Sequence, residues 1–133
     1  MDSTREKRKT RYAVLEGTFA VCRLAPTVPV PEWSLRAGFF SITRTADELS
    51  LVCAETHVPT GIPAEYGWAC LQLQGPFPFA MSGVLAAFIE PLADAGIGIL
   101  AISTFDTDCV LVKTDRLAAT IATLEQAGHT RTG

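Results

Sequence analysis

A polar hairpin between two apolar runs constrains the fold of this chain more than any other feature. Residues 97–112 read IGILAISTFDTDCVLV, so two apolar strands flank the polar segment 103–108. A helix is predicted directly before them, from Ser82-Gly83 to Ala95-Gly96, where Gly96 supplies a left-handed stop. With a further helix after the hairpin, this order predicts an α+β fold containing a ferredoxin-like βαββαβ unit.

The second half of the chain carries the other elements of that unit. Residues 68–74 alternate between apolar and polar, which predicts a half-buried strand. Thr114-Asp115 begins the last helix, and Gly128 ends it. Residues 129–133 are too polar and too short to predict a firm final strand. The closing strand is therefore either missing or borrowed from the N-terminal half.

Pro91 is the residue that fits its predicted element least well. It lies inside the helix, where the missing N–H and the ring cost about 3 kcal/mol in an isolated helix. We therefore expect tertiary packing to offset that cost.

The first half reads as a smaller set of strands. They are predicted at 12–15, 18–24, 39–44 and 50–55, with a proline-rich extended segment at 25–32. Thr45 and Glu48 have the spacing of a capping box, which predicts a short helix there. Prolines and glycines in 56–67 indicate a boundary. The predicted organisation is a basic tail at 1–11, a degenerate half at 12–55, a linker at 56–67 and a C-terminal domain at 68–133.

Charge limits the partners. The 133 residues carry a net charge of −3; the first eleven carry five basic and two acidic residues, a net +3, which leaves −6 for the rest. The tail is either a solvated, frayed end or a contact for an anionic surface. The body has no basic patch with interleaved aromatic residues, so we expect no nucleic-acid partner. No apolar run approaches the ~20 residues of a membrane span, and no signal sequence begins the chain, so we expect a cytoplasmic protein without membrane contact.

The residues capable of chemistry form no catalytic pattern. The four cysteines lie in apolar runs without metal or redox spacing, so they are predicted to be small buried hydrophobes. His57 and His129 fall in loop-like segments and are expected at the surface. We predict a protein that is not an enzyme and that holds no metal or cofactor.

Strands 97–103 and 109–112 are apolar on both faces, so something must cover the face opposite the helices. The N-terminal half, a second subunit or both would serve. Because a two-fold contact is the commonest remedy, we predict a homodimer.

A binding site is predicted where the first helix of the unit meets the hairpin. Exposed N–H groups and the helix dipole favour a carboxylate, while Asp106 and Asp108 accept bonds from an ammonium group. The alternative is that the hairpin residues only satisfy turn backbone. The candidate ligand-binding residues are Phe79, Ala80, Met81, Ser82, Gly83, Val84, Thr104, Phe105, Asp106, Thr107 and Asp108.

Several segments together resemble a known family. They are WACLQLQG at 68–75, SGVL at 82–85, EPLADAGI at 90–97 and STFDTD at 103–108, with FFSIT and ELSLV in the first half. This combination, over about residues 20–128, resembles the ACT-domain group that includes the cytosolic arginine sensors and small bacterial two-half ACT proteins.

The resemblance implies two ACT-like halves packed together and a regulatory role in which an amino acid binds at an ACT interface. It assigns a ligand contact to Asp108. The arginine sensors have an acidic residue where this chain has Met81, and Phe79 narrows the same loop, so we expect a small or medium amino acid without a basic side chain rather than arginine. The alternative is a ligand-free interaction module that docks onto an enzyme or another ACT chain.

Overall fold

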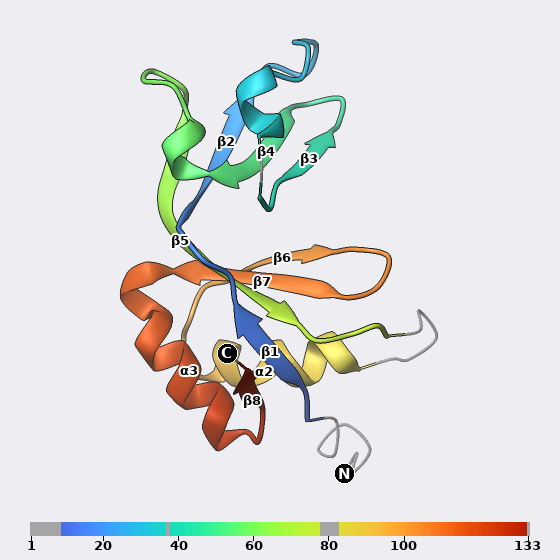
Figure 1. Ribbon diagram of the computed structural model, residues 1–133, viewed down its shortest axis with the longest axis vertical. Helices are drawn as coiled ribbons and strands as arrows, with labels where there is room; N and C mark the ends of the chain where they lie inside the picture. Colours follow the sequence, from blue (N-terminus) through green and yellow to red (C-terminus); the bar gives the residue numbers. More distant parts are fainter. Residues whose placement is uncertain (1–8, 37, 78–82, 133) are drawn as a thin grey trace. The chain divides into compact units, whose positions relative to one another are not determined.

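Strand β5 (Ala64–Leu73) contributes to two structural units of the chain (Figure 1). The computed structural model describes residues 9–36, 38–77 and 83–132. The small unit runs from Gly17 to Trp68, and the large unit combines the chain up to Glu16 with the chain from Ala69 onward.

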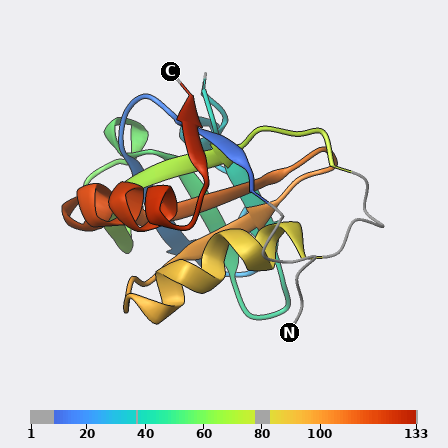
Figure 2. The ribbon, with the colours of Figure 1, turned by 90° about the horizontal axis from the view of Figure 1, so that it is seen from below.

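The large unit is a sheet covered by two helices. Along the sheet the strands follow the order β8-β1-β5-β7-β6. The helices α2 and α3 lie side by side (Figure 2). The bounds are β1 Arg11–Val14, α2 Val84–Asp94, β6 Leu100–Ser103, β7 Asp108–Lys113, the 3-10 helix η3 Thr114–Arg116, α3 Leu117–Gln126 and β8 Thr130–Thr132. The sequence order β5-α2-β6-β7-α3-β8 confirms the predicted ferredoxin-like βαββαβ unit.

The core of the large unit lies between the sheet and the helices. Val84, Phe88 and Leu92 are spaced four residues apart, so they form one buried stripe along α2. They pack against Leu71 and Val110 of the sheet, among other core residues. All four residues 109–112 of β7 are fully buried within one chain.

The strand that closes the sheet beside β5 comes from the N-terminal part of the chain, one of the two alternatives predicted. Residues 130–132 do form a strand, β8, but it pairs in parallel with β1 rather than with β5. Strand β1 lies between them and pairs antiparallel with β5. Residues 12–14, which we expected in the N-terminal half 12–55, and residue 11, which we expected in the tail, therefore belong to the sheet of the large unit.

The small unit is a sheet with the order β3-β4-β2-β5 and no α-helix among its described residues. Its core contains Ala20, Cys22, Leu49 and Leu51. The bounds are β2 Phe19–Leu24, the 3-10 helix η1 Glu32–Leu35, β3 Ser41–Arg44, β4 Leu49–Ala54 and the 3-10 helix η2 Glu55–His57. Strand β5 then starts at Ala64, inside the predicted linker 56–67.

The predicted helix at Thr45 is wrong. Residues 45–48 form the turn between β3 and β4, in which the Thr45 N–H donates to the Glu48 carbonyl at 2.9 Å. The Thr45 hydroxyl oxygen accepts from the N–H groups of Asp47 and Glu48, at 3.1 and 3.2 Å. A threonine that caps a helix makes the same local bonds in a turn, so the pattern did not distinguish the two.

The cysteines follow the prediction, and one histidine contradicts it. All four cysteines are free thiols in buried positions. His129, which we expected at the surface, is also buried. None of the helices in the described ranges is long and apolar enough to cross a membrane.

Candidate functional site

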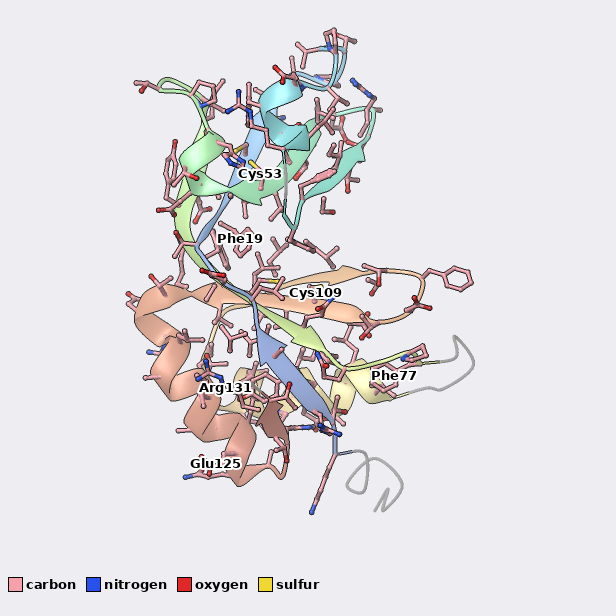
Figure 3. All side chains as sticks on the ribbon, in the orientation of Figure 1. Phe19, Cys53, Phe77, Cys109, Glu125 and Arg131 are labelled. Atoms are coloured by element: carbon pink, nitrogen blue, oxygen red, sulfur yellow. The ribbon has the colours of Figure 1, made fainter. Side chains whose placement is uncertain are left out.

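A cavity of about 190 Å³ lies in the large unit, between the first turn of α2 and the β6–β7 hairpin. We call it the hairpin pocket. Phe77 (labelled in Figure 3) forms part of its wall. Its other lining residues are Gly83, Val84, Leu85, Ala86, Ser103, Thr104, Phe105, Asp106, Thr107 and Asp108.

The start of α2 presents free backbone donors to this pocket. Gly83 has a φ of 84°, a left-handed conformation that suits glycine, and it precedes the first residue of the helix. The first helical bond runs from the Ala87 N–H to the Gly83 carbonyl, at 2.9 Å. The N–H groups of the first turn therefore have no acceptor within the helix, and no side chain of the described residues caps this helix start. This end of the pocket favours an anionic group such as a carboxylate.

The hairpin is held by its own polar groups. The Thr104 N–H donates to the Thr107 carbonyl at 2.8 Å, and the Thr104 hydroxyl lies 3.0 Å from the same oxygen. The Thr107 hydroxyl donates to the Leu73 carbonyl of β5 at 2.8 Å. Both threonine hydroxyls thus have structural partners, as the turn-backbone alternative expects.

The hairpin also approaches the segment after β5. The Phe77 N–H donates to the Asp106 carbonyl at 2.7 Å. A Cβ atom on Gly75 would lie only 2.7 Å from that carbonyl oxygen, so a side chain there would displace the hairpin. Gly75 therefore permits the contact that fixes Asp106.

The hairpin side of the pocket is lined by two residues with carboxylates, Asp106 and Asp108. Ser103 and Asp108 are directly opposite each other in the β6–β7 register, and the Ser103 hydroxyl donates to Asp108 Oδ1 at 2.6 Å. The Asp106 carboxylate makes no hydrogen bond or ion pair with any described residue. No lysine or arginine lines the pocket in the described part of the chain. These carboxylates favour a cationic group, so the pocket is complementary to a molecule that carries both an anion and a cation.

All of the predicted site residues that the structure describes come together here. Gly83, Val84 and residues 104–108 all line the pocket, although the Phe105 side chain is 80% exposed at the hairpin tip. Phe79, Ala80, Met81 and Ser82 lie outside the described residues. Among the described residues, no group of three or more His, Cys, Asp or Glu side chains is placed to hold a metal ion.

Sequence reasoning missed Phe77, Leu85, Ala86 and Ser103 as lining residues. The helical periodicity assigned Leu85 to the apolar stripe that faces the core, so it was not predicted to line a pocket from the first turn of α2. Ser103 carried a usable signal, because a two-strand hairpin around 104–107 brings residue 103 opposite Asp108.

Comparison with known proteins agrees with this fold. A family model described as an ACT domain matches residues 64–126, and a second model, described as an N-terminal domain, matches residues 17–61. A crystal structure of a protein from Agobacterium tumefaciens is 40% identical, with a TM-score of 0.89 over 93% of this chain and 92% of that one.

Two further matches have descriptive names. The bovine (Bos taurus) "cytosolic arginine sensor for mTORC1 subunit 1" is 29% identical over 100 residues, which is 67% of this chain and 30% of the sensor. This chain thus spans about three tenths of the curated relatives that it matches. The regulatory subunit of aspartate kinase from Thermus thermophilus is 11% identical, with a TM-score of 0.60 over 87% of this chain and 96% of that one, a likeness of fold alone.

Proposed function

Because this chain belongs to the ACT-domain proteins, in the group that includes the cytosolic arginine sensors, we propose that it is a regulatory module that binds a small amino acid in the hairpin pocket. The single observation that carries the proposal is the presence of both subsites in one pocket. The first turn of α2, with its backbone N–H donors, and the two aspartates Asp106 and Asp108 line the same pocket.

The ligand's α-carboxylate would accept bonds from the N–H groups of the first turn of α2. Its ammonium would donate to Asp108, whose Oδ1 already accepts from Ser103 and whose second oxygen is open to a ligand. Each contact is charge-assisted and therefore stronger than a neutral hydrogen bond. This binding mode involves no covalent chemistry, which agrees with a regulatory rather than a catalytic role.

The size of the pocket supports a small or medium ligand. About 190 Å³ is below the roughly 300–1,000 Å³ of sites for drug-sized molecules. We therefore propose an amino acid with a short, non-basic side chain, which agrees with the uncharged Met81 at the position where the arginine sensors have an acidic residue. The relative called a cytosolic sensor favours the cytoplasm as the place of action.

A thermal-shift screen of the twenty amino acids tests this proposal. We expect a small or medium non-basic amino acid to raise the melting temperature, because a ligand that binds only the folded state stabilises it. Stabilisation by arginine or lysine alone would contradict the ligand class. No response to any amino acid would contradict the sensor function and favour the ligand-free docking module.

We also propose that the chain forms a homodimer. The reason is no longer the apolar faces of the two strands but the edge of β6. Residues 109–112 are already buried within one chain, so they no longer require a partner. Strand β6, however, pairs only with β7 among the described strands, and its other edge is open to pairing. Light scattering at micromolar concentration should give twice the 14.3 kDa of one chain, and a mass near 14.3 kDa would exclude the dimer.

A further inference from the structure

The large unit has a second cavity of about 550 Å³. Other segments of the chain line it than line the hairpin pocket. We call it the edge pocket, because the edge strand β8 forms one wall and α3 another. Its side-chain lining includes Tyr12, Ile121, Glu125, His129 and Arg131. None of these residues lines the hairpin pocket.

Tyr12 is the unusual residue of the edge pocket. Its side chain is 1% exposed and packs edge-on against Phe88, with ring centroids 5.4 Å apart. Its hydroxyl nevertheless makes no hydrogen bond to a described residue, and it is not among the described side-chain atoms sealed from solvent. The hydroxyl of this otherwise buried side chain therefore reaches open space, where a water molecule or a polar ligand atom can pair with it. The open space of the edge pocket is where a partner would lie.

Two opposite charges accompany that hydroxyl. Arg131 is directly opposite Tyr12 in the β1–β8 register, so the two side chains share the helix-facing side of the sheet. Glu125 and Ile121 are four residues apart on α3 and therefore face the pocket together. Figure 3 shows Glu125 and Arg131 extending from α3 and β8. Neither charge forms an ion pair with a described residue.

We propose that the edge pocket is a second ligand site, for an apolar α-amino acid or a molecule with the same two charged groups. Arg131 binds the carboxylate, Glu125 binds the ammonium and the Tyr12 hydroxyl makes one further hydrogen bond to the ligand. The apolar side chain lies against Ile121. With about 550 Å³, the edge pocket takes a larger ligand than the hairpin pocket does. This inference stands apart from the proposed function, because no residue is shared between the two pockets.

The test uses the full chain and three probes that differ by one charged group. L-Leucine carries both charges, 3-methylbutylamine lacks the carboxylate, and 4-methylpentanoate lacks the ammonium. Amide chemical shifts in ¹⁵N-labelled protein locate each probe. We expect millimolar L-leucine to shift the amides of residues 128–131, and each single-charge probe to bind there about tenfold more weakly or worse.

Variants then assign each charge. Arg131→Gln should weaken leucine about tenfold and leave 3-methylbutylamine unchanged, because that probe has no carboxylate for Arg131 to bind. Glu125→Gln should weaken leucine and leave 4-methylpentanoate unchanged. Arg36→Gln, an exposed arginine of the small unit, is the matched control and should change nothing.

The position of the chemical shift changes distinguishes the outcomes that contradict the edge site from those that contradict the hairpin pocket. No shift at residues 128–131 with leucine overturns the edge site, whatever happens elsewhere. Leucine shifts confined to residues 83–86 and 103–108 also overturn it while supporting the hairpin pocket. Equal loss of all three probes in Arg131→Gln would show that Arg131 only maintains the fold. Shifts at 128–131 with none at the hairpin, for every amino acid tried, would instead contradict the proposed function alone.

Discussion

Ser103 determines how the Asp108 carboxylate is presented to the hairpin pocket. Its hydroxyl donates to one carboxylate oxygen at 2.6 Å, a length typical of charge-assisted O–H···O⁻ bonds. The bond restricts the orientation of the Asp108 carboxylate, so binding of the proposed amino acid would cost less side-chain entropy. The sequence indicated Asp108 as a ligand contact, but it indicated this supporting residue only through the hairpin register.

Buried thiols give a second residue-scale result. Burial, together with the neighbouring Cys53 thiol, raises the pKa of Cys22 from the ordinary 9.0 to about 11. The hydrogen bond to Cys109, together with burial, raises the pKa of Cys70. Because the thiolate is the reactive form, neither Cys22 nor Cys70 is expected to act as a nucleophile at neutral pH.

The raised pKa of Cys22 predicts a loss of stability at high pH. The folded state holds the Cys22 proton more tightly than the unfolded chain, so the contribution is fully present below pH 9.0 and is lost as the pH rises through about 11. Urea unfolding at about pH 8 and about pH 11 measures that loss. Cys22→Ala should lose less stability over this interval than the parent, and an equal loss would show that other groups cause it.

At the level of elements, His129 replaces the hydrogen-bond donor that Pro91 removes from α2. Residue 91 would donate its N–H to the Ala87 carbonyl in a regular helix, but proline has no N–H. His129 Nε2 lies 3.0 Å from that carbonyl oxygen, and its Nδ1 accepts the Thr10 N–H at 3.0 Å. The neutral ring with its proton on Nε2 makes both bonds. We expected packing to offset the cost of Pro91 in the helix. Part of that offset is a specific hydrogen-bond donor, His129, from the segment after α3.

The coupling between His129 and Pro91 can be measured. His129→Phe keeps an aromatic ring beside Phe88 but leaves the Thr10 N–H and the Ala87 carbonyl unpaired, so we expect a loss of roughly 2–4 kcal/mol in unfolding free energy. Pro91→Ala returns an N–H to the Ala87 carbonyl. The double variant should therefore be about 1 kcal/mol more stable than the sum of the single changes predicts.

Denaturant unfolding of the four proteins completes the cycle, with His57→Phe as the matched histidine control in the small unit. A coupling within the roughly 0.3–0.5 kcal/mol typical of independent sites would show that His129 does not replace the missing donor.

At the scale of the whole molecule, periodicity predicted elements better than it predicted connections. The stripe Val84, Phe88, Leu92 and the apolar run of β7 were legible because burial on one face repeats along an element. The insertion of β1 between β5 and β8 could not be predicted in this way, because strand order depends on pairing between residues more than a hundred positions apart. The same distance hid the burial of His129.

The candidate site was predicted in part for a similar reason. Helix start and hairpin are each local patterns, and the ferredoxin-like order brings them to one end of the sheet. The hydrogen-bond partners of the Thr104 and Thr107 hydroxyls could not be predicted, because threonines in a hairpin can bond either to the turn backbone or to a ligand.

Calorimetric titration measures whether the hairpin pocket binds an amino acid through Asp108. The amino acid that stabilises the protein most in the thermal-shift screen is titrated into the parent, Asp108→Asn and the matched surface control Asp115→Asn. The Asn variant keeps the shape and loses the charge, which is worth about 1.5–3 kcal/mol in such a bond. We predict a ten- to hundredfold weaker affinity for Asp108→Asn and an unchanged affinity for Asp115→Asn; equal affinity in all three proteins would contradict the account.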